Sequence, residues 1–387
     1  MIYLDYAATT PMLDEVIDEM MPYMKERYGN PSSIHKFGRQ ANNALQLARK
    51  KISSLINGKG VVVFTSGATE ANNLALKGYA NSMKRKGNHI ITSSIEHEAI
   101  LEPCRELEKN GFDVTYLPVD KYGIIDLNAL ENSISDKTIL ISIMFANNEV
   151  GSVQPVKEIS EIAYKHDIVF HTDAVQAAGK IPVDVQSLGI DMITLSAHKM
   201  YGPKGVGALC ICNDLEIEPV MHGGGQENEI RSGTQNVAGI VGMGKAAELA
   251  MQHMDDYASH VKQLRDALID SVSSKIKYSK LNGHPVQRLP NNAHFTFLGV
   301  NGEDLIIKLD ENGIESSTGS ACSVQKQKAS HVLKAMGLNH EEVTGSLRLT
   351  LGIQNTVEEI DATVNALVEI VGELRKVSPY GLKYNVT

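Results

Sequence analysis

An acid and an amine stand at the ends of two short apolar segments in the middle of the chain, where both could act on one ligand. Asp173 ends the mainly apolar run at 168–172, and Lys199 follows a second run at 191–196. Short apolar runs bounded by polar residues predict buried strands. Neighbouring strand ends of an open α/β sheet face the crevice in which such folds bind ligands.

This pair of side chains suits pyridoxal phosphate, whose aldehyde condenses with a lysine while an acid binds its pyridinium nitrogen. Lys199 must be able to lose its proton before it condenses, whereas Asp173 must stay ionised to keep the ring nitrogen protonated. The spacing alone is also typical of an ordinary salt bridge or of two solvated loop ends. The other motifs of the chain decide between these interpretations.

Composition argues against several other classes of protein. A chain of 387 residues with 42% hydrophobic residues is long enough for one large domain and a smaller one. Its net charge of -9, with no Lys/Arg cluster larger than residues 84–86, argues against a nucleic-acid-binding surface. Asp5 stands where a signal peptide needs a basic region, and apolar runs such as 139–146 are too short to span a bilayer. The four cysteines show no disulfide framework spacing, which fits a reducing compartment. Together these features predict a cytoplasmic protein that binds neither membrane nor nucleic acid.

Predicted strands alternate with predicted helices around the two strand ends, which is typical of a mostly parallel sheet. The strands are expected at 61–64, 89–93, 113–117, 138–145, 168–173, 191–196 and 206–212. The last should be antiparallel, because a short loop without a helix precedes it. Two helices, at about 238–251 and 258–273, are expected to lead the chain out of this large domain, which we place at residues 13–257. Residues 1–12 and 258–387 are expected to form a smaller α+β domain.

A candidate phosphate site follows the first of these strands. Residues 65–69 (TSGAT) lead from the strand at 61–64 into a predicted helix. Unpaired amides and the helix dipole at such a helix start attract an anion. The cofactor phosphate can therefore bind here, with the hydroxyl of Thr69 as an additional donor.

Several motifs occur along the chain in a characteristic order. They are DYAATTP at 5–11, GNPSS at 29–33, TSGATEANN at 65–73, NNE at 147–149, SAHK at 196–199, RSGT at 231–234 and STGSAC at 317–322. With these motifs the chain resembles, over nearly its whole length, the pyridoxal-phosphate-dependent cysteine desulfurases of the NifS/IscS type, within the fold-type-I aminotransferase superfamily. The resemblance implies a fold-type-I pyridoxal-phosphate transferase, whose large domain holds a mostly parallel seven-stranded sheet.

The resemblance also implies a role for each matching residue in cofactor binding. Lys199 corresponds to the Schiff-base lysine, Asp173 to the partner of the pyridinium nitrogen, and Gln176 to the residue that hydrogen-bonds the phenolic oxygen. His97 corresponds to the imidazole that stacks on the ring and moves protons. The residues that correspond to phosphate contacts are Ala68, Thr69, Ser196, His198 and Thr234, the last supplied by the other subunit of a homodimer.

Two further residues correspond to contacts with the substrate carboxylate. They are Asn148 and Arg348, and the planar guanidinium of Arg348 suits a bidentate clamp. The sequence by itself also allows plainer interpretations. Asn148 is typical of a turn, Arg348 of an exposed ion pair on a strand, and His97 of a surface or loop-capping histidine.

The cysteines separate into two groups. Cys104 lies on the apolar stripe of a predicted helix, and Cys210 and Cys212 share a strand face without a neighbouring metal-binding motif. Core packing explains these three. Cys322 lies in the small polar segment 316–323, which is typical of an accessible thiol. In the resemblance it takes the place of the nucleophile that receives sulfur.

The expected function is therefore that of a cysteine desulfurase, which converts L-cysteine to L-alanine and keeps the sulfur as a persulfide on Cys322. An iron–sulfur scaffold or a thiolation protein would accept this sulfur. The free enzyme is expected to hold no metal, with Cys322 as a transient iron–sulfur ligand during delivery. The alternatives are a selenocysteine lyase, a fold-type-I aminotransferase, and a non-enzymatic sulfur-relay or scaffold-binding protein. The intact Lys199, Asp173 and His97 argue against the last of these.

Overall fold

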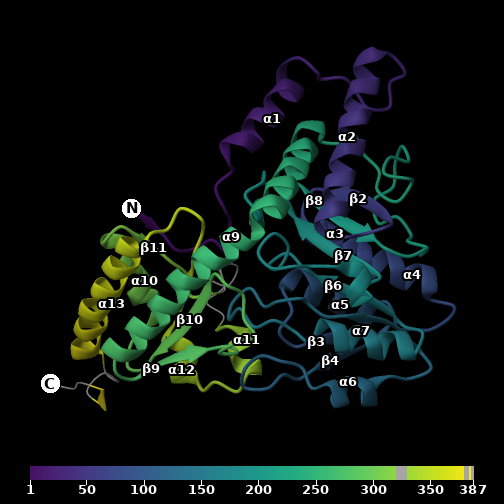
Figure 1. The fold of residues 1–387 in the computed structure, drawn as a ribbon. Coiled ribbons are helices and arrows are strands. Elements are labelled where there is room, and N and C mark those ends of the chain that lie inside the picture. Colours follow the sequence, from purple (N-terminus) through teal and green to yellow (C-terminus); the bar gives the residue numbers. More distant parts are fainter. Residues whose placement is uncertain (320–328, 379–382, 385–387) are drawn as a thin grey trace.

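The computed structural model describes residues 1–319, 329–378 and 383–384 (Figure 1). Its larger half is built around a seven-stranded sheet with the strand order β2-β8-β7-β6-β5-β3-β4. The strands are β2 (Val61–Thr65), β3 (His89–Ser93), β4 (Asp113–Leu117), β5 (Thr138–Ser142), β6 (Val169–Asp173), β7 (Met192–Ser196) and β8 (Gly207–Ile211). β8 pairs antiparallel with both neighbours, and the other pairings of this sheet are parallel. The mostly parallel sheet expected from the sequence is confirmed, including the antiparallel strand near 206–212.

Buried apolar sequence explains why these segments are strands. Every residue of β3, β5, β7 and β8 is buried, as expected where both faces of a sheet are covered. The helical segments of this half are α3 (Ala68–Asn73), η1 (Leu74–Gly78), α4 (Tyr79–Met83), α5 (Glu98–Lys109), α6 (Leu127–Ser133), α7 (Val156–Lys165), α8 (Val185–Leu188) and η2 (Ala197–Lys199). The helix α5 is amphipathic and buries Ile100, Cys104 and Leu107 on one stripe.

One long helix, α9 (Val237–Lys275), connects the two halves of the molecule (Figure 1). The prediction of two helices at 238–251 and 258–273 is wrong, because no glycine or proline interrupts residues 245–275 and the helix runs straight through the expected break. The helix packs against α1 (Asp14–Lys25) and α2 (Lys36–Leu55). Its later residues, among them Leu264 and Leu268, lie in the hydrophobic core of the smaller half.

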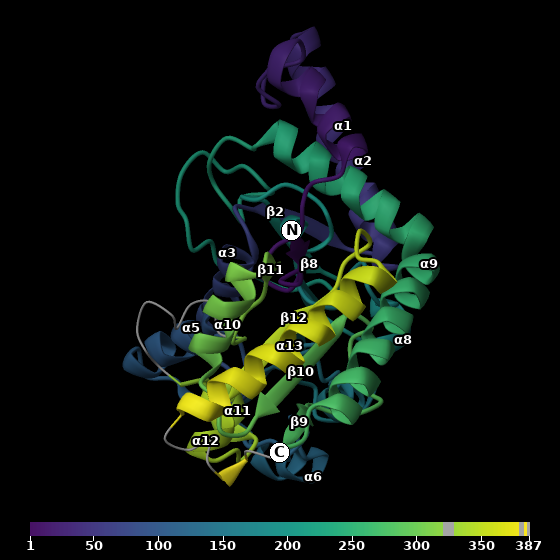
Figure 2. The same ribbon diagram turned by 90° about the vertical axis from the view of Figure 1, so that its left-hand side faces the viewer.

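The smaller half contains a three-stranded antiparallel sheet in the order β12-β10-β9. The strands are β9 (Ser279–Asn282), β10 (Asn292–Phe297) and β12 (Ser346–Thr350), and the helices are α10 (Gly302–Glu311), α11 (His331–Ala335), α12 (His340–Thr344) and α13 (Val357–Val377). The helix α13 packs beside α9 (Figure 2). A short parallel pair, β1 (Ile2–Tyr3) with β11 (Ile314–Glu315), brings the N-terminus to this half. Leu4 and Tyr6 consequently lie in its core.

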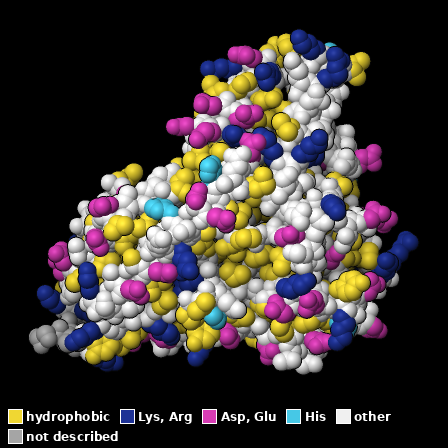
Figure 3. All heavy atoms as spheres, viewed as in Figure 1, with side chains coloured by type: hydrophobic (Ala, Val, Ile, Leu, Met, Phe, Trp, Pro, Cys, Tyr) yellow, Lys and Arg dark blue, Asp and Glu magenta, His cyan; other side chains and the backbone are white. Residues whose placement is uncertain are grey.

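On the face shown in Figure 3, Lys and Arg side chains intermingle with Asp and Glu side chains. Among the described residues, no helix combines the length and the apolar character that crossing a membrane requires.

The direction of the strands decides where functional side chains gather. The strands of the large sheet other than β8 run parallel, so their carboxyl ends lie on one edge. Asp173 ends β6, Ser196 ends β7 and Ser93 ends β3. The segments that carry Gln176, Lys199 and His97 therefore leave the sheet on the same side.

Candidate active site

Lys199 lies one turn beyond the end of β7, in the 3-10 helix η2. Its Nζ atom donates hydrogen bonds to the carbonyl oxygens of Ala7 at 2.5 Å and Ala8 at 2.7 Å. Thr10 donates two more bonds, from its amide and its hydroxyl, to the carbonyl oxygen of His198. The N-terminal motif at 5–11 is therefore packed against the lysine turn, although Ala7 and Lys199 are 192 residues apart in the sequence.

Asp173 lies on the strand next to the lysine turn, because β6 pairs with β7 and places Asp173 opposite Thr194. Asp173 is 8% exposed. Its carboxylate accepts hydrogen bonds from Asn72 Nδ2 at 2.7 Å and from the amide of Val175 at 3.0 Å. Both donors stabilise the ionised form of the carboxylate. The sequence analysis missed Asn72, although a polar residue on the buried side of α3 was the available signal.

Gln176 is buried three residues beyond Asp173, and its Nε2 atom donates to the carbonyl oxygen of Ala7 at 3.0 Å. The amide of Gln176 and the amine of Lys199 thus share one acceptor. The Oε1 atom of Gln176 accepts a hydrogen bond from Lys180 Nζ at 2.9 Å. The sequence analysis also missed Lys180, because a lysine in a polar turn is usually solvated.

His97 follows β3 and caps the N-terminus of α5, with its Nδ1 atom accepting a hydrogen bond from the amide of Ala99 at 3.1 Å. The loop-capping role is therefore real, and it does not compete with a role in proton transfer. Burial lowers the pKa of His97, and the charge of Lys199 lowers it further, while Asp173 opposes the shift. A neutral ring that accepts at Nδ1 carries its proton on Nε2. Since the charges of Asp173 and Lys199 both affect His97, the imidazole belongs to the same site as these two residues.

The anion loop lies between β2 and α3. Ser66 and Gly67 lead from the strand into the helix, whose first residues are Ala68 and Thr69. Gly67 has a φ of 156°, and a Cβ atom on Gly207 would lie 2.5 Å from its carbonyl carbon. Glycine is therefore required at both positions. Thr69 is exposed and Ala68 is half-buried, so the helix start is open to an anion from solvent.

Two further predicted phosphate contacts lie beside this loop. Ser196 and Thr65 are both paired with Gly207 of β8, which places the end of β7 near the anion loop. His198 follows η2's first residue and is half-buried. Burial lowers the pKa of His198 to about 4, with Lys199 adding to the shift. The ring is therefore neutral at physiological pH.

Thr234 lies on the irregular segment between β8 and α9 and is exposed. In the same segment, Arg231 forms an ion pair with Glu70 at 2.7 Å, and Glu70 also accepts from the amide of Ser66 at 2.7 Å. These contacts connect the segment to the anion loop of its own chain. The exposed hydroxyl of Thr234 is accessible to a second chain.

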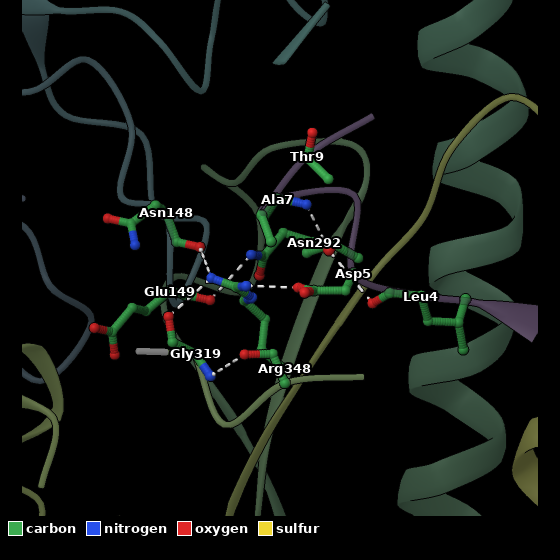
Figure 4. Close-up of polar contacts among 12 residues, drawn as sticks. Leu4, Asp5, Ala7, Thr9, Asn148, Glu149, Asn292, Gly319 and Arg348 are labelled. Carbon is green, nitrogen blue, oxygen red and sulfur yellow. Dashed lines mark hydrogen bonds and ion pairs between the residues drawn. The ribbon is translucent and has the colours of Figure 1, made fainter. Parts of the chain in front are cut away.

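Arg348 lies where three segments meet, in the middle of β12 (Figure 4). Its Nη1 atom donates to the carbonyl oxygens of Asn148 at 3.0 Å and Gly319 at 2.9 Å, and its Nη2 atom donates to Asp5 Oδ1 at 2.7 Å. The interpretation as an exposed ion pair is wrong, because Arg348 is only 2% exposed. Its Nε atom is buried and has no partner among the described residues. The structure thus brings the two predicted substrate contacts, Asn148 and Arg348, together.

Cys322 falls within residues 320–328, which lie outside the described residues. The described residues on both sides of that segment contact Glu149. Ser330 Oγ donates to Glu149 Oε2 at 2.6 Å, and a Cβ atom on Gly319 would lie 3.3 Å from the same oxygen. Burial raises the pKa of Glu149, which is 2% exposed. A buried acid of the NNE motif therefore bonds Ser330 on one side of the segment that carries the predicted nucleophile and lies close to Gly319 on the other.

Burial raises the pKa of the other cysteines. That of Cys212 rises to about 12, and those of Cys104 and Cys210 rise further. These thiols remain protonated at neutral pH and are poor nucleophiles. Cys104 and Cys210 are buried in hydrophobic clusters, so the predicted packing role is confirmed for both.

This set of groups fits pyridoxal phosphate. An amine and a hydrogen-bonded carboxylate lie at adjacent strand ends, and a buried amide shares a carbonyl oxygen with the amine. An open helix start offers an anion site on the same edge of the sheet. These are the donors and acceptors that an aldehyde, a pyridinium nitrogen, a phenolic oxygen and a phosphate require.

Comparisons with known proteins agree with this geometry. The family described as Aminotransferase class-V matches residues 2–363. A protein of Dictyoglomus turgidum named cysteine desulfurase IscS is 51% identical over 386 residues, which cover 100% of this chain and 98% of the relative. A protein of the same name from Methanosarcina thermophila is 52% identical over 379 residues, covering 98% of this chain and 94% of the relative.

Solved structures show the same relationship. A NifS-like protein superposes with a TM-score of 0.91 at 38% identity, covering 96% of this chain and 100% of that chain. A NifS-like protein from Rickettsia africae gives a TM-score of 0.86 at 33% identity, with coverages of 96% and 99%. A protein described as SspA in complex with cysteine gives 0.82 at 37% identity, with coverages of 92% and 100%.

Proposed function

The chain belongs to the IscS-type cysteine desulfurases of the aminotransferase class-V family, and we propose that it converts L-cysteine to L-alanine and retains the sulfur on Cys322 as a persulfide. The observation that carries this proposal is the convergence of Lys199, Asp173 and the anion loop on one sheet edge, in a chain about half identical to named cysteine desulfurases. The enzyme depends on pyridoxal phosphate. When bound, this group supplies an electron sink that makes the Cα proton of the substrate acidic and weakens the bond between Cβ and sulfur.

Two side chains of the site, Lys199 and Asp173, act on protons and charge. Lys199 Nζ forms the covalent link to the cofactor and, once released, accepts the Cα proton. The carbonyl oxygens of Ala7 and Ala8 orient this amine. Asn72 and the amide of Val175 donate to the Asp173 carboxylate and orient it, and Asp173 would bind the ring nitrogen of the cofactor and hold a proton there.

Arg348 and Asn148 bind the substrate. The guanidinium of Arg348 is fixed by Asp5 and by two carbonyl oxygens, and its Nε donor remains for a carboxylate. A fixed guanidinium pays little conformational entropy on binding. Asn148 is half-buried beside it and offers an amide to the same carboxylate.

Sulfur transfer needs a nucleophile, and Cys322 takes this role by its match to the family motif STGSAC at 317–322. The raised pKa values of Cys104, Cys210 and Cys212 agree with this assignment. The Cys322 thiolate attacks the sulfur atom of the substrate. The bond between Cβ and sulfur breaks and its electron pair stays with carbon. Protonation of Cβ by His97 or Lys199, and return of the Cα proton from Lys199, then give alanine. The persulfide then passes to an acceptor, an iron–sulfur scaffold or a thiolation protein, in a cytoplasmic homodimer to which Thr234 of the other subunit contributes a phosphate contact.

The experiment that tests this function measures the products formed from L-cysteine. We expect alanine and, in the absence of an acceptor, a persulfide located on Cys322 by peptide mass spectrometry. Cys322→Ser should keep the absorbance of the bound cofactor and form no alanine, while the matched variant Cys212→Ser should behave like the wild type. Pyruvate in place of alanine would indicate an aminotransferase. Undiminished release by Cys322→Ser, with selenocysteine preferred over cysteine, would indicate a selenocysteine lyase.

A further inference from the structure

A second lysine is buried beside the catalytic one. Lys180 lies in the turn that follows β6 and is 2% exposed. Burial lowers its pKa to about 7, and the charges of Lys199 and Arg348 add to this shift. Placing another amine in this cationic region opposes folding unless the amine is hydrogen-bonded. The hydrogen bond that it makes therefore needs an explanation.

That hydrogen bond acts together with one to Ala7 to determine which end of the Gln176 amide faces the site. Lys180 Nζ donates to Gln176 Oε1 at 2.9 Å, and Gln176 Nε2 donates to the carbonyl oxygen of Ala7 at 3.0 Å. Below its pKa the Lys180 side chain is an ammonium, which has only donors, whereas a carboxamide has a donor end and an acceptor end. A flipped amide would place its NH2 group against the ammonium and its oxygen against a carbonyl oxygen. Both contacts would be repulsive.

We propose that Lys180 is a positioning residue that holds the Gln176 amide with its NH2 group toward Ala7 and the phenolic oxygen of pyridoxal phosphate. The proposal rests on the cofactor assignment of the proposed function. Lys180 acts through Gln176 and does not itself touch the reacting atoms. Since Lys199 donates to the same carbonyl oxygen of Ala7, the amide and the catalytic amine are placed relative to one another by a shared acceptor.

The first test uses the cofactor-loaded protein and the pH midpoint of its visible absorbance band, which reports how tightly a proton is held at the Lys199 nitrogen. A donor on the phenolic oxygen weakens that hold. Lys180→Met should therefore raise the midpoint by about one pH unit, a tenfold change in proton affinity. Replacing a buried lysine with an apolar residue of similar size should leave the fold intact. Lys157→Met, at an exposed lysine of α7, is the control and should leave the midpoint unchanged.

A double-mutant cycle separates positioning from a simple effect of charge. If Lys180 acts through the amide, Lys180→Met should have no further effect on the midpoint in a Gln176→Leu background. An equal shift in both backgrounds would overturn the proposal, because it would show that the lost charge acts directly on Lys199. An unchanged midpoint in the single variant would overturn it as well.

The second test needs neither cofactor nor a Lys180 variant. The Gln176 side-chain amide resonance of 15N-glutamine-labelled, cofactor-free protein is identified by its loss in Gln176→Leu. We expect it to shift with pH as Lys180 titrates, with a midpoint near 7. His198, with a pKa of about 4, does not titrate in this range. Glu96, with a pKa of about 8, does, so the same shift should also appear in Glu96→Gln. A resonance that does not move between about pH 6 and 8 would refute the contact. A wild-type protein that shows this shift but no visible band with pyridoxal phosphate would refute the proposed function instead.

Discussion

Arg348 and Asp5 form a partly buried ion pair across 343 residues of sequence, with Arg348 Nη2 donating to Asp5 Oδ1 at 2.7 Å. The pair joins the N-terminal motif to the middle of β12, and the same arginine holds the carbonyl oxygens of Asn148 and Gly319. Its Nε atom is the buried donor left without a partner among the described residues. The guanidinium is therefore held in one orientation by three contacts, with one donor left over.

Arg348→Lys should weaken substrate binding more than it slows the chemical steps. An ammonium cannot keep three fixed contacts and also donate to a carboxylate in the plane of the original guanidinium. We expect KM for L-cysteine to rise and kcat/KM to fall by about 10- to 100-fold. Steady-state kinetics check this, with Arg375→Lys on α13 as the control. A fall in kcat at unchanged KM would contradict the assignment.

Lys199→Ala should abolish both alanine formation and the visible absorbance of pyridoxal phosphate bound to the protein. The amine is the group that links to the aldehyde, and no neighbouring group replaces that bond. Absorbance spectra and borohydride reduction followed by peptide mapping provide the measurement. Lys157→Ala is the control at an exposed lysine. Retention of a reducible link in Lys199→Ala would show that another lysine binds the cofactor.

Two substitutions of His97 separate its roles as helix cap and as proton carrier. Asparagine can replace the Nδ1 acceptor at the N-cap but cannot carry a proton, whereas alanine can do neither. We expect kcat to fall by about 100-fold in both variants. Stability should be nearly unchanged in His97→Asn and lower by about 1 kcal/mol in His97→Ala. A His97→Asn enzyme with wild-type kcat would reduce His97 to a helix cap.

His97 should also give the pH profile of activity an acid limb. Burial, together with Lys199, lowers the pKa of His97 below its ordinary value of 6.5. The neutral imidazole is therefore present at neutral pH, and activity that depends on it should be lost as the pH falls through the lowered pKa. The limb should disappear from the residual activity of His97→Asn.

Glu96 should make the folded protein less stable as the pH rises. Its carboxyl group is fully buried, accepts from Ser93 Oγ and from the amide of Met144, and has an Oε2 atom without a partner among the described residues. Burial raises its pKa from 4.5 to about 8. The folded state then binds a proton that the unfolded state releases. The stabilisation is complete below the unfolded pKa of 4.5 and is lost as the pH rises toward 8, at a slope of at most about 1.4 kcal/mol per pH unit.

Glu96→Gln should remove this slope, since glutamine keeps the acceptor oxygen and carries no titratable proton. Urea unfolding at about pH 5 and pH 8 measures the effect, and Glu102→Gln, at an exposed site on α5, is the control. A wild-type protein with equal stability at both pH values would contradict the raised pKa.

The sequence determined the large sheet and the edge on which its chemistry gathers. Buried strands can be predicted from local apolar runs of sequence, and the alternation of strands with helices predicts parallel pairing. Asp173 and Lys199 could therefore be assigned to adjacent strand ends from the sequence. Local signals also placed the turn at 65–69 between a strand and a helix start, where the structure has them. They failed for α9, where the expected domain change suggested a break that no residue in the helix enforces.

The tertiary structure alone decided which polar groups meet. Asn72 holds Asp173 across 101 residues, Lys180 orients Gln176, and Asp5 pairs with Arg348 across 343 residues. Hydrophobic periodicity reports how each segment faces its neighbours, and it carries no information about the partner of a buried donor. That partner depends on how distant segments pack, because a buried polar group binds whatever complementary atom the folded chain places within about 3 Å.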